Sequence, residues 1–433
     1  MSSIPMLPAH SVRDSAQAVK RLVGHFIHTV TDTILSQFLD LPEFRVKGYA
    51  FEEQGDLSIV HLYCEHRHDV GVCPRCATVS EGGHQYEARC VRDLDLLGRH
   101  TFLHFPARRF KCCRCGRPFT EELPSIAVWR RQTRRFEAYI YQRCLSTSRK
   151  EIASQEWVDP STVTDILKRW AGKKAQALTR PLVRILGIDE IALRKHHKQF
   201  ALVLSDLELH CVIEVLEDRS KETLERWFDQ LSPEERLFIR TVSMDMWEPY
   251  CLAVKTKLPH AEIVVDRFHL MRQLNERITQ IRRNIQVHAD DAIKGVLKGS
   301  RWILVKNRDE LSDKEDAKLT SVLETCPQLR TLYLLKEEFR LIFENIHDRN
   351  QAIRFLNVWI CKVHLTKDKF LLKFVTTLQN WWKEILNYFH ERITNGFVEG
   401  INRAIRSIID RAYGFRNFHN FRLQVLAEHG PPR

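Results

Sequence analysis

Two aspartates, Asp189 and Asp245, each follow an apolar run of the kind that forms buried strands. The run before Asp189 is Val183 to Ile188, and the run before Asp245 is Phe238 to Met244. Both are short and contain β-branched residues, which favours strands covered on both faces. Carboxylates are the hard oxygen ligands that Mg²⁺ and Mn²⁺ prefer. If the two strands are neighbours in one sheet, the two acids predict a divalent-cation site at its edge.

The segments between these acids predict how the sheet is built. Apolar runs at Phe200 to Leu204 and Cys211 to Leu216 follow the first strand at hairpin-like spacings, so the sheet is expected to open as a three-stranded meander. A helix over Lys221 to Gln230 precedes the fourth strand. This β-β-β-α-β order, with an aspartate ending strands one and four, resembles a ribonuclease H-like nuclease sheet. The resemblance implies that strands one and four are neighbours, so that Asp189 and Asp245 meet.

Asp266 is an alternative to Asp245 as the second acid. It follows a further predicted strand, Ala261 to Val265, and precedes His269. If that strand were the fourth, the pair would be Asp189 and Asp266. We favour Asp245, because the sheet then has its fifth strand and because Asp266 is followed at once by a change in the sequence.

That change predicts an all-helical domain inserted before the sheet is complete. From Arg267 to Ile393 the chain contains two glycines and one proline, and apolar stripes recur throughout. The start of this stretch is basic and could line DNA, although a solvated helical face would look the same.

A third acid, Glu399, lies on a late helix predicted within Thr394 to Phe415. The apolar stripe of this helix is Phe397, Ile401, Ile405, Ile408 and Ala412. A different face carries Glu399, Asn402, Arg403, Arg406 and Asp410 at helical spacing. A surface ion-pair ladder would explain that spacing too. The order Asp, Asp, Glu favours a face that brings Glu399 to the cations and Arg403 and Arg406 to the nearby DNA strand.

Two Cys-x-x-Cys pairs predict a structural zinc site. The ligand set is Cys73, Cys76, Cys112 and Cys115. Each pair presents two thiolates from a tight turn, and two pairs complete a tetrahedral site with no open position for a substrate. Cys113 could replace a neighbour as ligand, and a redox pair or plain buried cysteines would be the alternative. Arg108 and Arg109 are among the arginines of this β-rich module that are expected to contact phosphates.

A helix-turn-helix is predicted after the zinc module. Arg149 to Glu156 forms a short helix, Trp157 to Asp159 a turn, and Pro160 to Trp170 a second helix capped by Asp159. The buried stripe of the second helix is Val163, Ile166 and Leu167. The residues expected to face the major groove and its phosphates are Ser161, Thr162, Thr164, Lys168 and Arg169, with Lys173 and Lys174 in the linker that follows.

Positive charge is concentrated in the same region. The 433-residue chain has a net charge of +12, and Arg89 to Arg180 holds 20 Lys and Arg against 9 Asp and Glu. This local excess predicts a dedicated region for binding a polyanion, namely DNA.

The remaining composition describes a multi-domain protein. With 44% hydrophobic and 28% charged residues, the chain can fill two or more cores. An amphipathic helix for packing or dimerisation is predicted over about Ser15 to Phe38. We expect no secretion signal and no membrane span, and the 12 cysteines are then expected to be reduced, with some of them metal ligands.

Taken together, these motifs resemble the ISL-three family of bacterial insertion-sequence transposases. The resemblance rests on the cysteine pairs, the helix-turn-helix and five short motifs: GIDE at 187–190, SMDMW at 243–247, VDRFH at 265–269, TNGFVEGIN at 394–402 and GFRNF at 414–418. It implies a DDE transposase whose triad is Asp189, Asp245 and Glu399. Asp266 and His269 would then support the active site.

The implied reaction is cleavage at the terminal inverted repeats of the insertion sequence, followed by strand transfer into target DNA. Two Mg²⁺ or Mn²⁺ ions would serve both steps, with Asp189 bridging them and Asp245 and Glu399 each holding one. A homodimer is expected because two transposon ends must be joined, and the site of action is the bacterial cytoplasm at the nucleoid. A transposase-derived DNA-binding regulator without catalysis and a structure-specific nuclease are the alternatives.

The predicted fold is therefore α/β and multi-domain: a ribonuclease H-like mixed sheet with an inserted all-helical domain, preceded by a β-rich zinc module and a helix-turn-helix. The expected division is an N-terminal helical segment (1–48), the zinc module (49–124), the helix-turn-helix (125–180), the first part of the catalytic domain (181–269), the helical insertion (270–392) and the last part of the catalytic domain (393–433).

Overall fold

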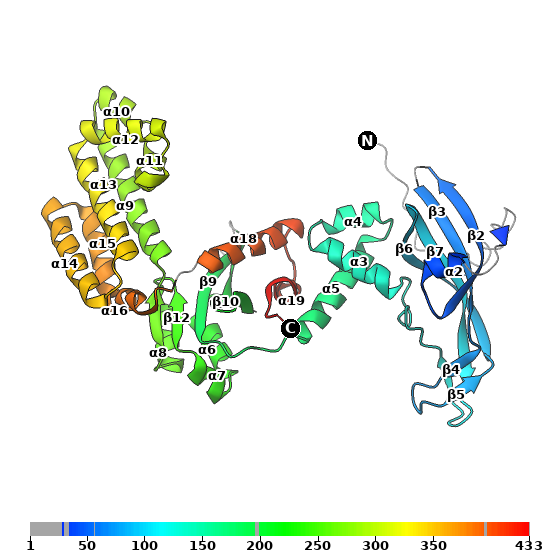
Figure 1. Ribbon diagram of the computed structural model, residues 1–433. Coiled ribbons are helices and arrows are strands. Elements are labelled where there is room, and N and C mark those ends of the chain that lie inside the picture. Colours follow the sequence, from blue (N-terminus) through cyan, green and yellow to red (C-terminus); the bar gives the residue numbers. More distant parts are fainter. Residues whose placement is uncertain (1–27, 30–33, 56, 195–198, 394–395, 433) are drawn as a thin grey trace. The chain divides into compact units, whose positions relative to one another are not determined.

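The computed structural model describes residues 28–29, 34–55, 57–194, 199–393 and 396–432. The chain forms two compact units, Met1–Trp170 and Ala171–Arg433. Figure 1 labels the elements of both units.

The first unit is built around a sheet that carries the cysteine pairs. Its strands are β1 (His28–Thr29), β2 (Phe44–Gln54), β3 (Leu57–His66), β6 (Gln85–Leu96), β7 (Arg99–Lys111) and β8 (Pro118–Thr120). Their order is β1-β2-β3-β7-β6, with β8 beside β7, and only β3 and β7 are paired in parallel among these strands. A separate hairpin is formed by β4 (Val70–Val72) and β5 (Val79–Glu81). The predicted β-rich module therefore contains most of a six-stranded sheet together with a separate two-stranded hairpin.

The N-terminal segment differs from the predicted helix. Residues 1–27 and 30–33 lie outside the described part of the chain, and the helix that is described, α2 (Ile34–Leu39), is short. His28–Thr29 instead pairs with β2 as strand β1. Phe44 and Val46, inside the segment predicted to be helical, are buried positions of β2. Apolar residues at every second position here fit a strand with one buried face.

Three helices follow the sheet of the first unit: α3 (Arg134–Cys144), α4 (Arg149–Gln155) and α5 (Pro160–Gln176). Asp159 caps α5, because its Oδ1 accepts the backbone N–H of Ser161 at 2.7 Å. The predicted stripe of Val163, Ile166 and Leu167 is buried. The helix continues past Trp170, so Lys173 and Lys174 lie in its last turn and not in a linker.

The second unit contains a five-stranded mixed sheet. Its strands are β9 (Ile185–Arg194), β10 (Gln199–Asp206), β11 (Cys211–Leu216), β12 (Thr241–Met244) and β13 (Glu262–Val265). The order is β11-β10-β9-β12-β13. The first three strands form an antiparallel meander, β12 is parallel to β9, and β13 is parallel to β12. The first and fourth strands are therefore neighbours, as predicted.

Two strand boundaries differ from the prediction. β9 does not end at Ile188 but continues through Asp189, which pairs with Val203 of β10. The antiparallel ladder with β10 supplies partners for this extension. β12 does not include Phe238, because Pro233–Phe238 forms helix α7, which begins with a capping box at Ser232.

Helices cover both faces of this sheet (Figure 1). On one face lie α6 (Lys221–Asp229) and α8 (Glu248–Lys257), and they contribute Trp227, Phe228 and Tyr250 to the core. On the other lie α18 (Gly396–Arg411) and α19 (Phe418–His429). The predicted stripe residues Ile401, Ile405 and Ile408 of α18 pack in that second core.

The inserted region is helical, as expected. It comprises α9 (Arg267–His288), α10 (Asp291–Leu297), α11 (Arg301–Val305), the 3₁₀ turn η2 (Arg308–Glu310), α12 (Asp313–Thr325), α13 (Pro327–Asn345), α14 (Arg349–Thr366), α15 (Lys369–Asn380), α16 (Trp382–Leu386) and α17 (Tyr388–Glu391). Its core, which includes Phe339, Trp359 and Phe374, is continuous with Val264 and Val265 of β13. Among the described residues, no helix has an apolar stretch long enough to cross a bilayer.

Candidate active site and four-cysteine cluster

Three aspartates stand in one row across neighbouring strands. The residues just before them, on β9, β12 and β13, are paired with one another in register: Ile188, Met244 and Val265. The next residues are Asp189, Asp245 and Asp266. Parallel strands in register place equivalent positions side by side, so the three acids lie along one edge. Asp245 follows the strand next to Asp189, whereas Asp266 follows the strand beyond it.

The carboxylate of Asp189 is fixed at both oxygens. The backbone N–H of Glu190 donates to Oδ1 at 2.8 Å, and the side-chain Nδ2 of Asn402 donates to Oδ2 at 2.5 Å. Burial raises the pKa of Asp189, while the two hydrogen bonds act in the opposite direction. Asp189 is therefore a buried acid whose ionised form depends on donors around it.

Asp245 is paired with a histidine from the first turn of α9. His269 Nδ1 lies 3.0 Å from Asp245 Oδ2, and His269 Nε2 lies 3.6 Å from Asp266 Oδ2. Burial opposes the ionisation of Asp245, but the hydrogen bond and charge of His269, the backbone N–H of Met246 and the charge of Arg272 together outweigh it, so the pKa of Asp245 is lowered. Asp266 in turn caps α9 by accepting the N–H of Phe268 at 3.0 Å. His269 thus connects the two aspartates, and Asp266 also has a structural task.

Glu399 approaches this row from α18, on the opposite side of the sheet from α8. The helix lies beside β9 at Gly187, where a Cβ would contact Val398 Cγ2 of α18 at 3.4 Å and would be too close, at 2.7 Å, to Leu207 Cδ2 after β10. Glu399 itself is well exposed, and its Oε1 lies 3.6 Å from Arg403. Three carboxylates repel one another, which is consistent with Glu399 being paired outward.

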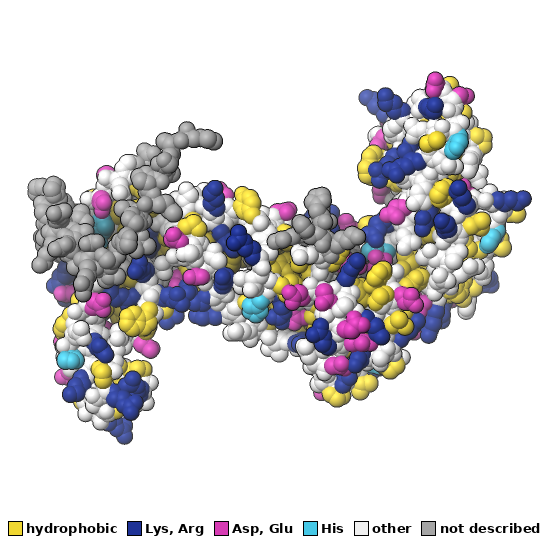
Figure 2. Space-filling model, turned by 180° about the vertical axis from the view of Figure 1, so that it is seen from behind, with side chains coloured by type: hydrophobic (Ala, Val, Ile, Leu, Met, Phe, Trp, Pro, Cys, Tyr) yellow, Lys and Arg dark blue, Asp and Glu magenta, His cyan; other side chains and the backbone are white. Residues whose placement is uncertain are grey.

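A cleft of about 570 Å³ lies between the sheet edge and the helical insertion, and Asp245, unlike Asp189 and Asp266, is not among its lining residues. Asp189, Asp266 and Glu399 line one side of it, and Arg340 and Glu344 of α13 line another. The helical insertion therefore forms a wall of the candidate site. Figure 2 shows Lys and Arg side chains over this insertion, at the right of the view. The exposed basic residues of its first helices include Arg283, Lys294, Lys298 and Arg301.

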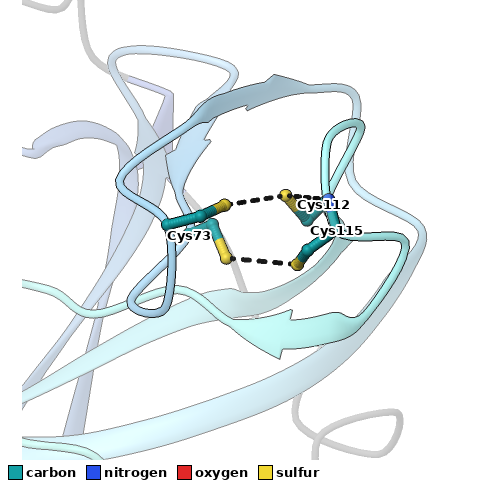
Figure 3. A group of neighbouring side chains, drawn as sticks. Cys73, Cys112 and Cys115 are labelled. Carbon is teal, nitrogen blue, oxygen red and sulfur yellow. Dashed lines mark hydrogen bonds between the residues drawn. The ribbon is translucent and has the colours of Figure 1, made fainter.

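The four predicted cysteine ligands gather at the end of the first unit's sheet (Figure 3). The sulfur atoms of Cys73, Cys76, Cys112 and Cys115 all lie within 4.8 Å of one another. The first two follow β4 and the last two follow β7. The backbone N–H of Cys115 donates to Cys112 Sγ at 3.4 Å, and such hydrogen bonds lower the pKa of the Cys112 thiol to about 6. Four thiols at these separations, one already favouring the thiolate, fit a tetrahedral zinc ion.

Cys113 points away from this cluster. Its Sγ lies 3.5 Å from the carbonyl oxygen of Val79 and 3.9 Å from Ser80 Oγ. The alternative in which Cys113 replaces a neighbour is therefore not the arrangement in this structure.

The structure contradicts one predicted phosphate contact in the zinc module. Arg108 is 5% exposed and its guanidinium binds Glu121, with Nε 2.7 Å from Oε2, and the carbonyl oxygen of His68 at 2.6 Å. At the end of β7 buried and exposed positions alternate, with Arg108 and Phe110 buried and Arg109 exposed, after the pattern has changed phase beyond Phe105. Arg109 remains available for DNA, and Arg108 is a structural residue.

The second helix of the helix-turn-helix divides its polar residues in a similar way. Ser161 and Lys168 are exposed, and Thr162 is partly exposed. Thr164 Oγ1 donates to the carbonyl oxygen of Pro160 at 2.9 Å. Arg169 differs from the prediction.

Arg169 is held within the first unit by a buried acid. Its Nη2 lies 2.7 Å from Oε1 of Glu137 on α3, and Trp170 Nε1 donates to the other oxygen of the same carboxylate at 3.3 Å. This pair ties α5 to α3, so Arg169 is a packing residue here and not a free phosphate ligand. On α18, by contrast, Arg403 and Arg406 are both exposed.

Asn402 and Gly187 are site residues that the sequence analysis named, Asn402 on the face of Glu399 and Gly187 in the GIDE motif, without giving either a role. Asn402 is recognisable only as a polar residue one turn after Glu399, and its contact with Asp189 joins residues 213 positions apart. Gly187 lies inside an apolar run, where nothing in the sequence indicates which helix will approach it.

The sequence matches three protein-family models. A family description headed "Transposase", for the DDE domain of ISL3 transposases, matches residues 186–425, which is more than half of the chain. The helix-turn-helix domain of transposase family ISL3 matches residues 121–171, and the zinc-finger of transposase IS204/IS1001/IS1096/IS1165 matches residues 69–115. The chain belongs to the ISL3 family of transposases. It is a DNA transposase with a DDE domain, a helix-turn-helix and a zinc ribbon.

Individual relatives agree with this assignment. The transposase for insertion sequence element IS1001 of Bordetella parapertussis is 29% identical over 371 residues, covering 84% of this chain and 90% of the relative. The transposase for insertion sequence element IS1557 of Mycobacterium tuberculosis is 24% identical over 403 residues, covering 86% and 89%. The predicted family and enzyme class are confirmed.

Proposed function

We propose that the mixed sheet is a ribonuclease H-like catalytic core whose triad is Asp189, Asp245 and Glu399. The observation that carries the proposal is the register of β9 and β12, which sets Asp245 beside Asp189. The approach of α18 to β9 at Gly187 supports the inclusion of Glu399. Asp266 is the weaker candidate for the second acid, since it lies one strand further away and caps α9.

The residues of this site suit hard divalent cations. Asp189 keeps one acceptor position on each oxygen beyond the donors it already has, because a carboxylate offers about four lone-pair sites. Asp189, Asp245 and Glu399 would together hold the Mg²⁺ or Mn²⁺ ions. Bound there, two such ions activate a nucleophile and stabilise a leaving oxygen in phosphodiester chemistry.

The protein's own residues have separate tasks around that chemistry. Burial raises the pKa of Asp189 and the hydrogen bonds from the N–H of Glu190 and from Asn402 oppose this rise, while His269 helps to lower the pKa of Asp245. Exposed Arg406 lines the same cleft and would bind a phosphate of the DNA strand beside the cut. Hydrolysis frees a 3′-hydroxyl, which would then attack target DNA in the same site.

Recognition of the transposon ends is proposed for the first unit. The exposed residues Arg109, Ser161 and Lys168 would contact the terminal inverted repeats, with Lys173 and Lys174 adding charge at the end of α5. One zinc ion held by the four-cysteine cluster would keep this unit folded. We propose that two copies pair two ends as a homodimer, and that the protein acts on double-stranded DNA at the bacterial nucleoid.

The proposal is tested by cleavage of a duplex that carries the DNA flanking the gene. The zinc-loaded wild type is expected to nick at a repeat boundary with Mg²⁺ or Mn²⁺, while Asp245→Asn binds the duplex and does not cut. The matched control is Asp229→Asn, which should cut normally. Asp229 is an exposed acid at the end of α6 and pairs with Lys257 at the end of α8. An Asp245→Asn protein that still cuts would show the assignment to be wrong.

The same assay separates the other functional classes. If no variant cuts while all bind the repeat, the protein would be a regulator. If the wild type cuts branched DNA regardless of sequence, it would be a structure-specific nuclease.

A further inference from the structure

Asn402 is the most buried polar side chain contributed by α18. It is 7% exposed and lies one turn after Glu399, whose side chain is 59% exposed. The neighbouring apolar residues Ile401 and Ile405 pack against the sheet. The helix therefore presents Glu399 to the cleft from its outer edge and Asn402 from its inner edge.

The two polar atoms of the Asn402 amide differ in their hydrogen bonding. Nδ2 donates to Asp189 Oδ2 at 2.5 Å. Oδ1 is buried and has no hydrogen-bond partner among the described residues. A buried amide oxygen without a partner costs folding free energy, so a leucine of similar shape would be the more stable choice if packing were the only demand. The amide is explained by what it does to Asp189.

We propose, resting on the active site proposed above, that Asn402 is a positioning residue that prepares Asp189 for cation binding. Its N–H fixes one carboxylate oxygen while the N–H of Glu190 fixes the other, so the carboxylate cannot rotate. One acceptor position per oxygen remains, and Asp189 lines the same cleft as Asn402. The buried Oδ1 has no hydrogen-bond partner among the described residues, so the only side-chain hydrogen bond that the amide makes there is the one to Asp189.

The inference applies the general behaviour of residues that orient metal ligands. Removing such a partner typically costs 10–100-fold in metal affinity, because the ligand must then be ordered at the moment of binding. We expect Asn402→Leu to weaken Mn²⁺ binding by at least about tenfold. This is measured by electron paramagnetic resonance titration of the full-length, zinc-loaded protein with Mn²⁺ and no DNA, so the readout does not depend on activity.

Two control variants separate positioning from stability. Asn387→Leu removes another buried amide of the same unit, which donates to the carbonyl oxygen of Ile263 at 2.9 Å, away from the three acids. Ile405→Val loosens the packing of α18 without touching Asp189. Both are expected to lower the thermal midpoint and to leave Mn²⁺ affinity within about twofold of wild type.

The outcomes are distinguishable from failure of the active-site proposal. If Asp245→Asn weakens Mn²⁺ binding and Asn402→Leu does not, the role given to Asn402 is wrong while the active site stands. If both controls weaken binding as much as Asn402→Leu, the effect is structural and the inference is also wrong. If the wild type binds no Mn²⁺, or binds it independently of Asp245, both proposals are refuted.

Discussion

Arg108 and Arg109 are adjacent on β7, yet the structure gives them opposite roles. Arg108→Ala would remove a guanidinium that is 5% exposed and leave Glu121, itself 14% exposed, beside His66 at 3.6 Å, whose pKa is lowered by burial so that its neutral form is favoured. Breaking a buried pair from one side typically costs 3–5 kcal/mol, because the remaining charge is left without a partner. We therefore expect the first unit to lose about 3 kcal/mol, the lower end of that range, since Glu121 keeps some access to water.

The measurement must report on the first unit alone, because a chain with two units need not unfold in one step. Hydrogen exchange of the backbone amides of β7 in the zinc-loaded protein provides this local free energy. A loss of about 3 kcal/mol corresponds to a fall in protection of roughly a hundredfold. The double variant Arg108→Met with Glu121→Leu should recover much of it, because apolar residues can replace a buried ion pair at little cost.

Arg109→Ala is the matched control, since the exposed neighbour has no such partner to lose. Protection of β7 should be unchanged, and binding to repeat DNA should weaken. If Arg109 contacts one phosphate, the slope of log affinity against log salt should fall in magnitude by about 0.9. The reasoning is refuted if Arg108→Ala keeps wild-type protection and it is this variant that loses the salt dependence.

Three further predictions concern the metal cluster, the approach of α18 and the pH response. Cys112→Ser should bind less zinc than wild type in metal analysis of the purified protein, whereas Cys113→Ser should retain one zinc per chain. Gly187→Ala places a Cβ 2.7 Å from Leu207 Cδ2, so we expect a loss of about 1–3 kcal/mol from overpacking, measured by thermal unfolding, together with reduced cleavage and unchanged repeat binding. Burial lowers the pKa of His104 from 6.5 to about 4, so the stability that its neutral form provides is complete above pH 6.5 and is lost as the pH falls toward 4. At pH 5 this loss of stability is about 2 kcal/mol, and His104→Phe should remove it. The test compares the free energy of opening from hydrogen exchange of wild type and His104→Phe between pH 5 and pH 7, because protonation of the thiols affects both proteins equally. If the two free energies depend on pH in the same way, the assignment is contradicted.

Sequence reasoning was most successful where a signal is local. The cysteine pairs, the capped second helix of the helix-turn-helix and the apolar run before Asp245 each depend on spacings of a few residues, and the structure has a corresponding element for each. The neighbouring positions of the first and fourth strands required a resemblance to a known sheet, because strand order is not encoded in any single run.

Sequence reasoning failed where a charged side chain has a partner distant in the chain. Arg108 and Arg169 were expected to face DNA because a basic residue is exposed by default. Their partners, Glu121 across the β7–β8 hairpin and Glu137 on α3, are visible only once the strands and helices are packed. In a basic region, total charge thus overstates the number of cations that are free to meet phosphates.

The extension of β9 beyond Asp189 explains why this acid receives a hydrogen-bond donor from α18, whereas the donors to Asp245 come from its own loop and from α9. β12 and β13 end just before their aspartates, so those carboxylates begin a loop or a helix and can be capped locally. Asp189 is instead held inside a strand that is paired on both sides up to Ile188 and with β10 beyond it, where burial raises its pKa. A ligand in the middle of a sheet gains a fixed position at the expense of water contacts, and those contacts must be replaced by protein donors. Asn402 lies on α18, the helix that also carries Glu399, and together with the N–H of Glu190 it replaces those water contacts. The folding of α18 therefore affects how the carboxylate of Asp189 is held for cation binding.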